Sequence, residues 1–397
     1  MRQLRVTLET VTPLFLGGAD PRDGPELRAP SLRGALRYWL RAALGGVLGA
    51  DEARLGAVRA AESAVFGSTD ASFGGASAIT LRISGEASLP TLTYSEITEG
   101  NQGIAYLLFS ARGTRREPER RGLVGTFALD MLTRPGAPGA EDAFTKAYAA
   151  LWLLTHLGGV GARARRGAGA LQVTAEEGDA VAGQWMPSLE IGASTPAALA
   201  EELKGGLETL RRLLATTSTV SIQRPSAFDV LHPNACRIWV VDRTYDGWKA
   251  ALDEIGRTLQ GFRNRRPPDS ETVRNAIQGK PLARPVERAA FGLPIPFFYR
   301  SDRATATLEG EEHDRRSSPL LLRVVKLANG RYATVLLWFQ SVFLPEGDQL
   351  KLTHWRGATV GNLPGSRLLE TFLVGADPIR RSSLRDRRLS ALEVDYV

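Results

Sequence analysis

The sequence predicts an α+β protein of two domains, the first of them ferredoxin-like. Candidate elements before residue 180 follow the order strand, helix, strands, helix, strand, which is that of a ferredoxin-like sheet with helices on one face. The length of 397 residues suits two domains of about 100 to 200 residues each. Apolar residues make up 43% of the chain and charged residues 23%, so each domain can bury a core.

The first strand and helix lie before residue 50. Apolar and polar residues alternate over residues 2–10, which predicts a half-buried strand. Residues 11–30 are rich in Pro and Gly and predict a long loop. Ser31 is then expected to cap a helix over residues 32–48, where apolar side chains recur at helical spacing.

The rest of the first half supplies three strands, a helix and a last strand. The strands are predicted over residues 78–84, 104–110 and 124–132. A helix over residues 143–157 stops at two consecutive glycines, which is typical of a helix C-terminus. A glycine-rich loop leads from it into a strand over residues 170–175.

The second half is also expected to be α+β. Residues 180–198, rich in Pro, Gly and Ala, predict a linker. Beyond it we expect a strand over residues 236–243, a helix over 245–260 and a long hairpin over 320–343, whose turn is Asn329-Gly330 because both residues accept positive φ. The spacing does not give the order of these strands. The predicted domains span residues 1–180 and 200–397.

The charge of the chain favours a polyanionic partner. Its net charge is +7 and its isoelectric point about 9.7, which favours nucleic acid over a small neutral metabolite. A G+C-rich genome would also raise the number of arginines. Genome composition does not explain their clustering, since residues 257–300 carry nine basic groups against three acidic ones.

Other features exclude several classes of protein. The longest apolar stretch, residues 147–154, is far shorter than the roughly 20 residues that cross a bilayer. The chain opens on a strand pattern rather than a signal peptide, so we expect a cytoplasmic protein without a membrane segment. A single cysteine, Cys236, excludes an internal disulfide and a cysteine-based metal cluster.

The first basic motif is a stripe of arginines on the first helix. Arg33, Arg37 and Arg41 are spaced four residues apart and follow Arg28, so they line one edge of the buried face. The alternative is an ordinary solvated helix face.

The second basic motif is the glycine-rich loop, residues 158–169, with five glycines, three arginines and no acidic residue. Glycines let a backbone approach a phosphate closely, and arginines neutralise it. The loop lacks the Lys and Ser/Thr of a P-loop and joins helix to strand, which excludes a P-loop and a Rossmann fingerprint. The alternative is a flexible connection with incidental charge.

In the second half, residues 262–266 and 291–300 combine cations with aromatic rings that could stack on unpaired bases. The alternative is a Pro-rich core crossing that packs Phe297 and Phe298 inward. Arg315 and Arg316 could contact phosphates, whereas the five arginines within residues 380–388 are more typical of a solvated tail.

Catalytic constellations are weak. The four histidines occur singly, without metal-site spacing, so we expect no metal or other cofactor. His156 could be a general base in RNA cleavage, but a histidine at a helix end more often caps the last carbonyls. Asp20 and Asp23 could hold a divalent ion, but acidic residues in a Gly/Pro loop are usually turn formers.

Two segments near the start carry a family resemblance. Residues 12–20 (Thr-Pro-Leu-Phe-Leu-Gly-Gly-Ala-Asp) and 26–39 (Glu-Leu-Arg-Ala-Pro-Ser-Leu-Arg-Gly-Ala-Leu-Arg-Tyr-Trp) resemble the amino-terminal signature of the Cmr subunit-one family. This family belongs to the RAMP superfamily of type III-B CRISPR effector complexes. Residues 158–169 are similar to the glycine-rich loop of that superfamily, and residues 291–297 and 315–322 to its second-domain motifs.

The resemblance implies two tandem ferredoxin-like (RRM-like, RAMP) domains with insertions. It also implies a non-catalytic RNA-binding subunit in antiviral defence, which holds the 3′ region of the guide RNA and the 5′ part of a target single-stranded RNA beside other RAMP subunits. Target slicing would then belong to a different subunit. The residues carried over as RNA contacts are Arg28, Ser31, Arg33, Arg37, Arg41, Gly159, Gly161, Arg163, Arg165, Arg166, Gly167, Arg315 and Arg316.

Two other functions stay open. One is an RNA endonuclease of the same superfamily that processes guide precursors through His156 or Asp20. The other is a scaffold whose arginine loops contact acidic patches of partner subunits. The second domain also departs from the superfamily pattern, because it has no recognisable arginine-bearing glycine loop of its own.

Overall fold

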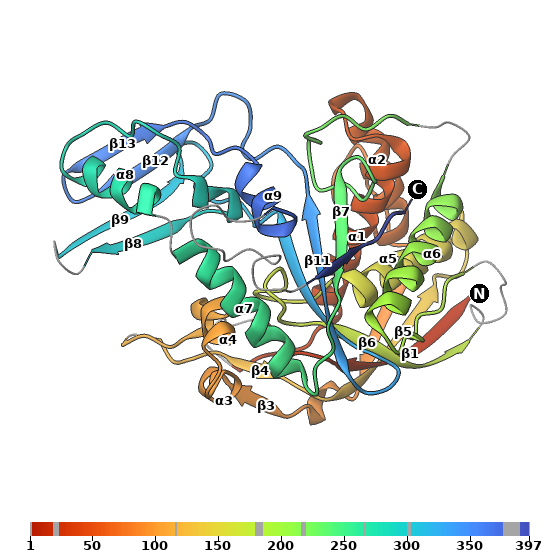
Figure 1. Ribbon diagram of the computed structural model, residues 1–397. Helices are drawn as coiled ribbons and strands as arrows, with labels where there is room; N and C mark the ends of the chain where they lie inside the picture. The colour runs from red at the N-terminus through yellow and green to blue at the C-terminus, as the bar shows by residue number, and fades with distance from the viewer. Residues whose placement is uncertain are drawn as a thin grey trace. The chain divides into compact units, whose positions relative to one another are not determined.

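The computed structural model describes residues 2–18, 24–115, 117–178, 186–215, 220–264, 267–299, 303–375 and 390–396. The chain forms two compact units (Figure 1). The first unit comprises residues 1–256, 321–339 and 391–397, and the second comprises residues 257–320 and 340–390. The domain boundary predicted between residues 180 and 200 stays a prediction. Within the described ranges, every helix is too short or too polar to span a bilayer.

The first unit contains an antiparallel sheet in the order β2-β5-β1-β6. Counted along the chain these are the second, third, first and fourth strands, which is the ferredoxin-like order. Helices α1 and α2 connect β1 to β2, and α5 connects β5 to β6. The bounds are β1 Gln3–Thr10, α1 Ala29–Leu48, α2 Glu52–Phe66, β2 Ile79–Ser84, β5 Thr126–Thr133, α5 Ala140–Leu157 and β6 Leu171–Gly178.

A second sheet of the same unit repeats this strand order. It runs β10-β11-β7-β14, again the second, third, first and fourth strands of their segment, so the fold holds two ferredoxin-like domains in tandem. Residues 257–320 and 340–390, which interrupt the strands of this sheet along the chain, form the second unit. The bounds are α6 Pro196–Leu214, β7 Cys236–Val241, α7 Trp248–Asn264, β10 Leu320–Lys326, β11 Tyr332–Phe339 and β14 Ala391–Glu393.

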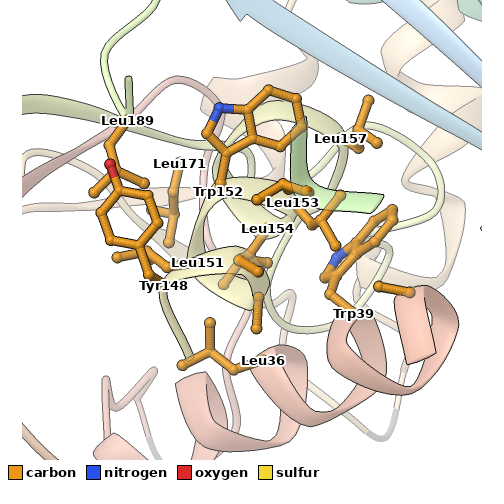
Figure 2. Close-up of a cluster of buried hydrophobic side chains, with 14 of the residues drawn as sticks. Leu36, Trp39, Tyr148, Leu151, Trp152, Leu153, Leu154, Leu157, Leu171 and Leu189 are labelled. Carbon is orange, nitrogen blue, oxygen red and sulfur yellow. The ribbon is translucent and has the colours of Figure 1, made fainter. Parts of the chain in front are cut away.

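The core of the first unit lies around α5, which is apolar on nearly every side and therefore buried along most of its length. Figure 2 shows Leu36 and Trp39 of α1 beside Leu153 and Leu154 of α5. Trp39 and Trp152 are each 1% exposed, so these two large side chains anchor the packing of the helices.

The second unit is built on a four-stranded antiparallel sheet in the order β13-β12-β9-β8. One face of this sheet packs against α8 and contributes Leu308 and Leu352 to a core of its own. The bounds are α8 Pro267–Ile277, β8 Ile295–Tyr299, β9 Ala304–Gly310, β12 Leu350–His354, β13 Gly357–Gly361 and α9 Arg367–Leu373.

Most predicted elements are present, but one strand was wrong. Residues 104–110 fall in helix α4 (Gln102–Leu107) and a short 3-10 helix, Phe109–Ala111. The cause is a tertiary contact: the carboxylate of Asp253 on α7 accepts hydrogen bonds from the N–H groups of Gly103, at 2.7 Å, and Ile104. These are orphan donors at a helix N-terminus, which no nearby residue reveals. Helices α3 (Tyr94–Thr98) and α4 lie along the chain between β3 (Thr91–Thr93) and β4 (Arg121–Leu123), which pair in a small two-stranded sheet.

Candidate nucleic-acid interface

Helix α1 begins earlier than the sequence suggests. Its N-cap is Arg28, it has a proline in its first turn, and no side chain caps it. Ser31 lies inside the first turn, where its N–H donates to the Arg28 carbonyl at 3.0 Å. The prediction that Ser31 is the N-cap was wrong, because Pro30 is pre-organised for the start of a helix and needs no N–H partner there.

The arginine stripe of α1 is partly neutralised within the protein. Arg37 forms an ion pair with the carboxylate of Glu62 on α2, and Arg41 lies 3.5 Å from the same carboxylate. Glu62 is only 3% exposed. A buried carboxylate requires cationic partners, so Arg37 and Arg41 have a structural role whatever else they bind.

Arg28 and Arg33 are bound less tightly by acidic groups. The Nε of Arg28 is 3.6 Å from a carboxylate oxygen of Glu26, and both side chains are exposed to solvent. The Nε of Arg33 is buried and has no hydrogen-bond partner among the described residues. These two arginines therefore retain more capacity for an external anion than Arg37 and Arg41.

The glycine-rich loop is attached to the segment that follows β1. The N–H of Ala162 donates to the Phe15 carbonyl at 2.8 Å, and the N–H of Gly169 donates to the Pro13 carbonyl at 2.9 Å. Two segments that are far apart in sequence, residues 12–20 and 158–169, therefore meet in their described parts.

Packing inside the chain accounts for the glycines of this loop. Gly161 has φ +87°, and a Cβ there would lie 2.5 Å from the Phe15 carbonyl oxygen. Gly167 has φ +83°, and a Cβ would lie 2.4 Å from the side chain of Leu252. At Gly159 the Ala168 carbonyl oxygen would be 2.9 Å away. The loop thus needs glycines to pack against its own protein, and close approach to a phosphate stays a prediction.

Arg165 turns inward from the loop. Its guanidinium forms an ion pair with Asp229, donates to the Tyr38 hydroxyl of α1 at 3.0 Å and lies over the Tyr38 ring at 5.3 Å. Asp229 is 8% exposed at its side chain. The structure therefore joins the two basic motifs at this cluster, but it uses the charge of Arg165 internally.

The other two loop arginines remain partly exposed. Arg163 adopts φ +65°, and its carbonyl accepts from the N–H of Arg166 at 2.7 Å. Arg166 forms a parallel bridge with Leu322 of β10, whose N–H donates to the Arg165 carbonyl at 3.2 Å. The backbone of the loop is therefore hydrogen-bonded both to the segment that follows β1 and to strand β10 of the second ferredoxin-like sheet.

Within the second unit, the predicted arginines differ in exposure. Arg315 is 81% exposed at its side chain, with Asp314 3.9 Å away. Arg316 donates to the Ser341 hydroxyl at 2.6 Å and bridges Leu293 through its backbone. Arg315 is therefore the more accessible cation of the two.

The aromatic residues of the second unit also differ in their exposure to solvent. Phe262, Phe291 and Phe297 are buried, as the inward-packing interpretation expects for Phe297. That interpretation was wrong for Phe298, which is 70% exposed on β8, because neighbouring residues of a strand point to opposite faces.

His156 is buried and cannot react with a ligand at the protein surface. The side chain is 1% exposed, its Nδ1 is 2.9 Å from the Trp152 carbonyl oxygen, and its ring stacks on that of Trp152. Burial and, second to it, the charge of Arg323 lower the pKa of His156 to about 3, so the imidazole is neutral near pH 7. It hydrogen-bonds one turn back rather than capping the last carbonyls.

The other catalytic candidates give no site. Asp20 and Asp23 lie outside the described residues, as do residues 380–388. Across the described ranges, no group of three or more His, Cys, Asp or Glu residues is arranged to hold a metal ion.

Sequence reasoning missed Arg323, a charged residue in the apolar strand β10. It is 1% exposed and donates to the carbonyls of Leu154, Thr155 and Gly158 at the end of α5, and to that of Leu171 at 2.7 Å. A cation is favourable at a helix C-terminus, where carbonyls lack partners. The available signal was a single arginine between buried aliphatic residues in Leu-Leu-Leu-Arg-Val-Val.

Comparisons with known proteins agree on one family. A model of the RAMP superfamily matches residues 7–172. The Cmr subunit Cmr1-1 of Pyrococcus furiosus is 26% identical over 352 residues, which cover 88% of this chain and 90% of that protein. The Cmr subunit Cmr1-2 of the same organism is 32% identical over 184 residues, which cover 42% of this chain and 92% of that protein.

Solved structures share the fold. The crystal structure of apo Cmr1 from Pyrococcus furiosus superposes with a TM-score of 0.63 at 20% identity, over all of this chain and 99% of that one. A chain in the cryo-EM structure of the type III-B Cmr-beta complex bound to cognate target RNA gives a TM-score of 0.52 at 11% identity, over 87% of this chain and 96% of that one. The protein described here belongs to the Cmr1 family of the RAMP superfamily.

Proposed function

We propose that this protein is a cytoplasmic, non-catalytic, RNA-binding subunit of a type III-B CRISPR effector complex. It holds the 3′ region of the guide RNA, the target RNA, or both, beside other RAMP subunits. The family assignment supports membership of such a complex. The likeness to a chain of a Cmr-beta complex bound to target RNA supports RNA as the ligand.

One observation carries the proposal: the two basic motifs meet in the first unit, where Arg165 of the glycine-rich loop contacts Tyr38 of α1. This contact fixes the loop beside the helix that carries Arg28 and Arg33. Arginines on a rigid scaffold bind phosphate with little ordering cost. Glu62 and Asp229 already neutralise Arg37, Arg41 and Arg165, so these three are weaker candidates. The leading contacts are Arg28 and Arg33 of the helix, with Arg163 and Arg166 of the loop because their side chains are partly exposed.

A ribonuclease is the weaker candidate. Its base would have to reach RNA, and His156 is buried in the core of the first unit. A buried imidazole whose hydrogen bond goes to the backbone cannot take a proton from a 2′-hydroxyl at the surface.

The test uses the full chain and end-labelled single-stranded RNA, with Mg²⁺ and with EDTA, on native and denaturing gels across a salt series. We expect intact, shifted RNA in both conditions. In a variant with Gln at positions 28, 33, 163 and 166, the slope of log affinity against log salt should fall by roughly 0.7 for each phosphate that the protein no longer neutralises. A charge-matched control carries Gln in place of exposed arginines elsewhere in the first unit: Arg54, Arg59, Arg82 and Arg120.

If both variants lost affinity equally, RNA binding would depend on the total positive charge of the protein and not on these four arginines. If the first variant bound RNA like the wild-type protein, the surface formed by Arg28, Arg33, Arg163 and Arg166 would not be the RNA-binding site. Discrete cleavage by the wild-type protein would overturn the non-catalytic assignment.

A further inference from the structure

We infer that the open face of the second-unit sheet β13-β12-β9-β8 is a stacking platform for single-stranded RNA. This inference rests on the proposed RNA-binding function but concerns a different surface. It starts from two large aromatic side chains that the fold leaves in solvent: Phe298 is 70% exposed and Trp355 is 69% exposed.

The strand pairing places both residues at the same end of the sheet. Phe298 of β8 pairs with Thr305 of β9. The pairing of β9 with β12 ends at Ala306 and His354, and Trp355 follows directly in the turn of the β12–β13 hairpin, where His354 pairs with Gly357. Both rings therefore belong to the end of the sheet at which Thr305 and Ala306 lie.

The remainder of this face is largely small and polar, with one exposed aliphatic residue, Val360 of β13, which pairs with Lys351 and is 46% exposed. Alternation along the strands puts Thr307 and Thr353 beside Thr305, while Leu308 and Leu352 point to the buried side. Threonine hydroxyls can donate to and accept from ribose and base edges. A stable protein interface would instead need an apolar centre with about 800 Å² buried on each partner.

Cations accompany the rings. The guanidinium of Arg356 lies 4.4 Å from the centre of the Trp355 ring, and Lys351 lies on the open face. Glu309 shares that face and accepts from the Thr353 hydroxyl at 3.3 Å. The indole remains mostly exposed although Arg356 stacks on it, so a base can use the exposed part of its surface while the arginine neutralises a phosphate.

The first ferredoxin-like sheet, β2-β5-β1-β6, offers no comparable platform. Residues of β1 on its outward face are Gln3, Arg5, Thr7 and Glu9, and Arg5 is paired with Asp130 at 2.9 Å. The corresponding residues of β2 and β5 include no aromatic ring: Thr80, Arg82, Ser84, Thr126, Ala128, Asp130 and Leu132. Of these two sheets, the one in the second unit therefore offers the exposed aromatic rings on which bases can stack.

The test measures the affinity of the full chain for a single-stranded oligouridylate at several salt concentrations. Each ring removed in Phe298→Ala and Trp355→Ala should weaken binding about fivefold or more, because a base loses its stacking partner. The salt slope should not change, since no cation is removed. The pair Phe298→Tyr and Trp355→Phe should keep wild-type affinity, whereas Phe298→Leu should behave like the alanine variant.

Phe109→Ala is the matched control, because Phe109 is 54% exposed in the first unit and should not affect binding. If the ring variants bind like wild type while the arginine variant of the proposed function loses affinity, the platform is wrong and the function stands. If the wild-type protein does not bind RNA, both fail. If the ring variants bind RNA normally but no longer assemble with other subunits, the face is a protein interface and the inference is overturned.

Discussion

Arg165 and Tyr38 lock the glycine-rich loop to helix α1: the guanidinium donates to the phenol oxygen at 3.0 Å and lies over the ring. The phenol in turn donates to Asp229 at 3.0 Å. Burial and then the charge of Asp229 raise the pKa of Tyr38, so the hydroxyl stays protonated and the chain of hydrogen bonds persists at all physiological pH values. Arg165, which the glycine-rich loop suggests as an RNA contact, therefore links the loop to helix α1.

Arg165→Ala should cost about 3 to 5 kcal/mol of unfolding free energy, because it leaves Asp229 buried without its cation. Urea unfolding followed by circular dichroism measures this. Tyr38→Phe, the control, removes one hydrogen bond and should cost about 1 kcal/mol. Equal stability of Arg165→Ala and wild type would show that the cluster does not stabilise the fold.

Glu62→Gln separates the two possible roles of Arg37 and Arg41. The substitution removes the buried carboxylate that both arginines contact, so stability should fall by about 1 to 3 kcal/mol. If these arginines also face RNA, freeing them should tighten binding and steepen the salt dependence. A salt slope equal to that of wild type would assign both arginines to structure alone.

The sequence predicted the first ferredoxin-like domain well because its signals are local. Strand alternation over residues 2–10 and helical periodicity over 143–157 need no tertiary information, and both elements are present. The order of the second sheet was not predictable, because the second unit separates its strands along the chain. The prediction of a strand over residues 104–110 failed for a similar reason. The N–H groups at the start of helix α4 donate to Asp253, which is 150 residues away.

The sequence predicted which arginines belong to the candidate site, but not which acidic side chains form ion pairs with them. The spacing of Arg33, Arg37 and Arg41 is visible in the sequence, whereas Glu62 and Asp229 occur in segments without any distinctive motif. Which arginine is neutralised depends on how α2 and the segment around Asp229 pack. For the same reason the sequence marks Arg323 as unusual within an apolar strand but does not reveal its acceptors, which lie more than 150 residues away.

Arg323→Met should destabilise the protein by about 3 to 5 kcal/mol. The substitution keeps side-chain volume but leaves the carbonyls at the end of α5 without their donor. Arg323→Lys should lose less, because it keeps a cation at the helix C-terminus. Arg82→Met, at an exposed position of β2, should change unfolding free energy by less than about 0.5 kcal/mol. If Arg323→Met were as stable as the Arg82 control, the four carbonyls would have to find other donors.

His156 should make the protein sensitive to acid between pH 6.5 and 3. Its pKa falls from 6.5 to about 3 in the folded state, first because of burial and second because of Arg323, while the carboxylate of Glu202 is 3.9 Å from its Nε2. In this window the unfolded chain binds a proton that the folded chain does not. The stabilisation is therefore complete above pH 6.5 and is lost at about 1.4 kcal/mol per pH unit as the pH falls toward 3.

The measurement compares urea unfolding of wild type and His156→Gln from pH 7.5 to 4. Gln keeps a hydrogen-bond donor for the Trp152 carbonyl but does not titrate, so the variant should lose stability less steeply with acid. His232, whose burial lowers its pKa to about 4, contributes to the slope of both proteins and cancels in the difference. Identical slopes would mean that the folded protein accepts a proton at His156. That result would require water or Glu202 to reach the imidazole inside the core.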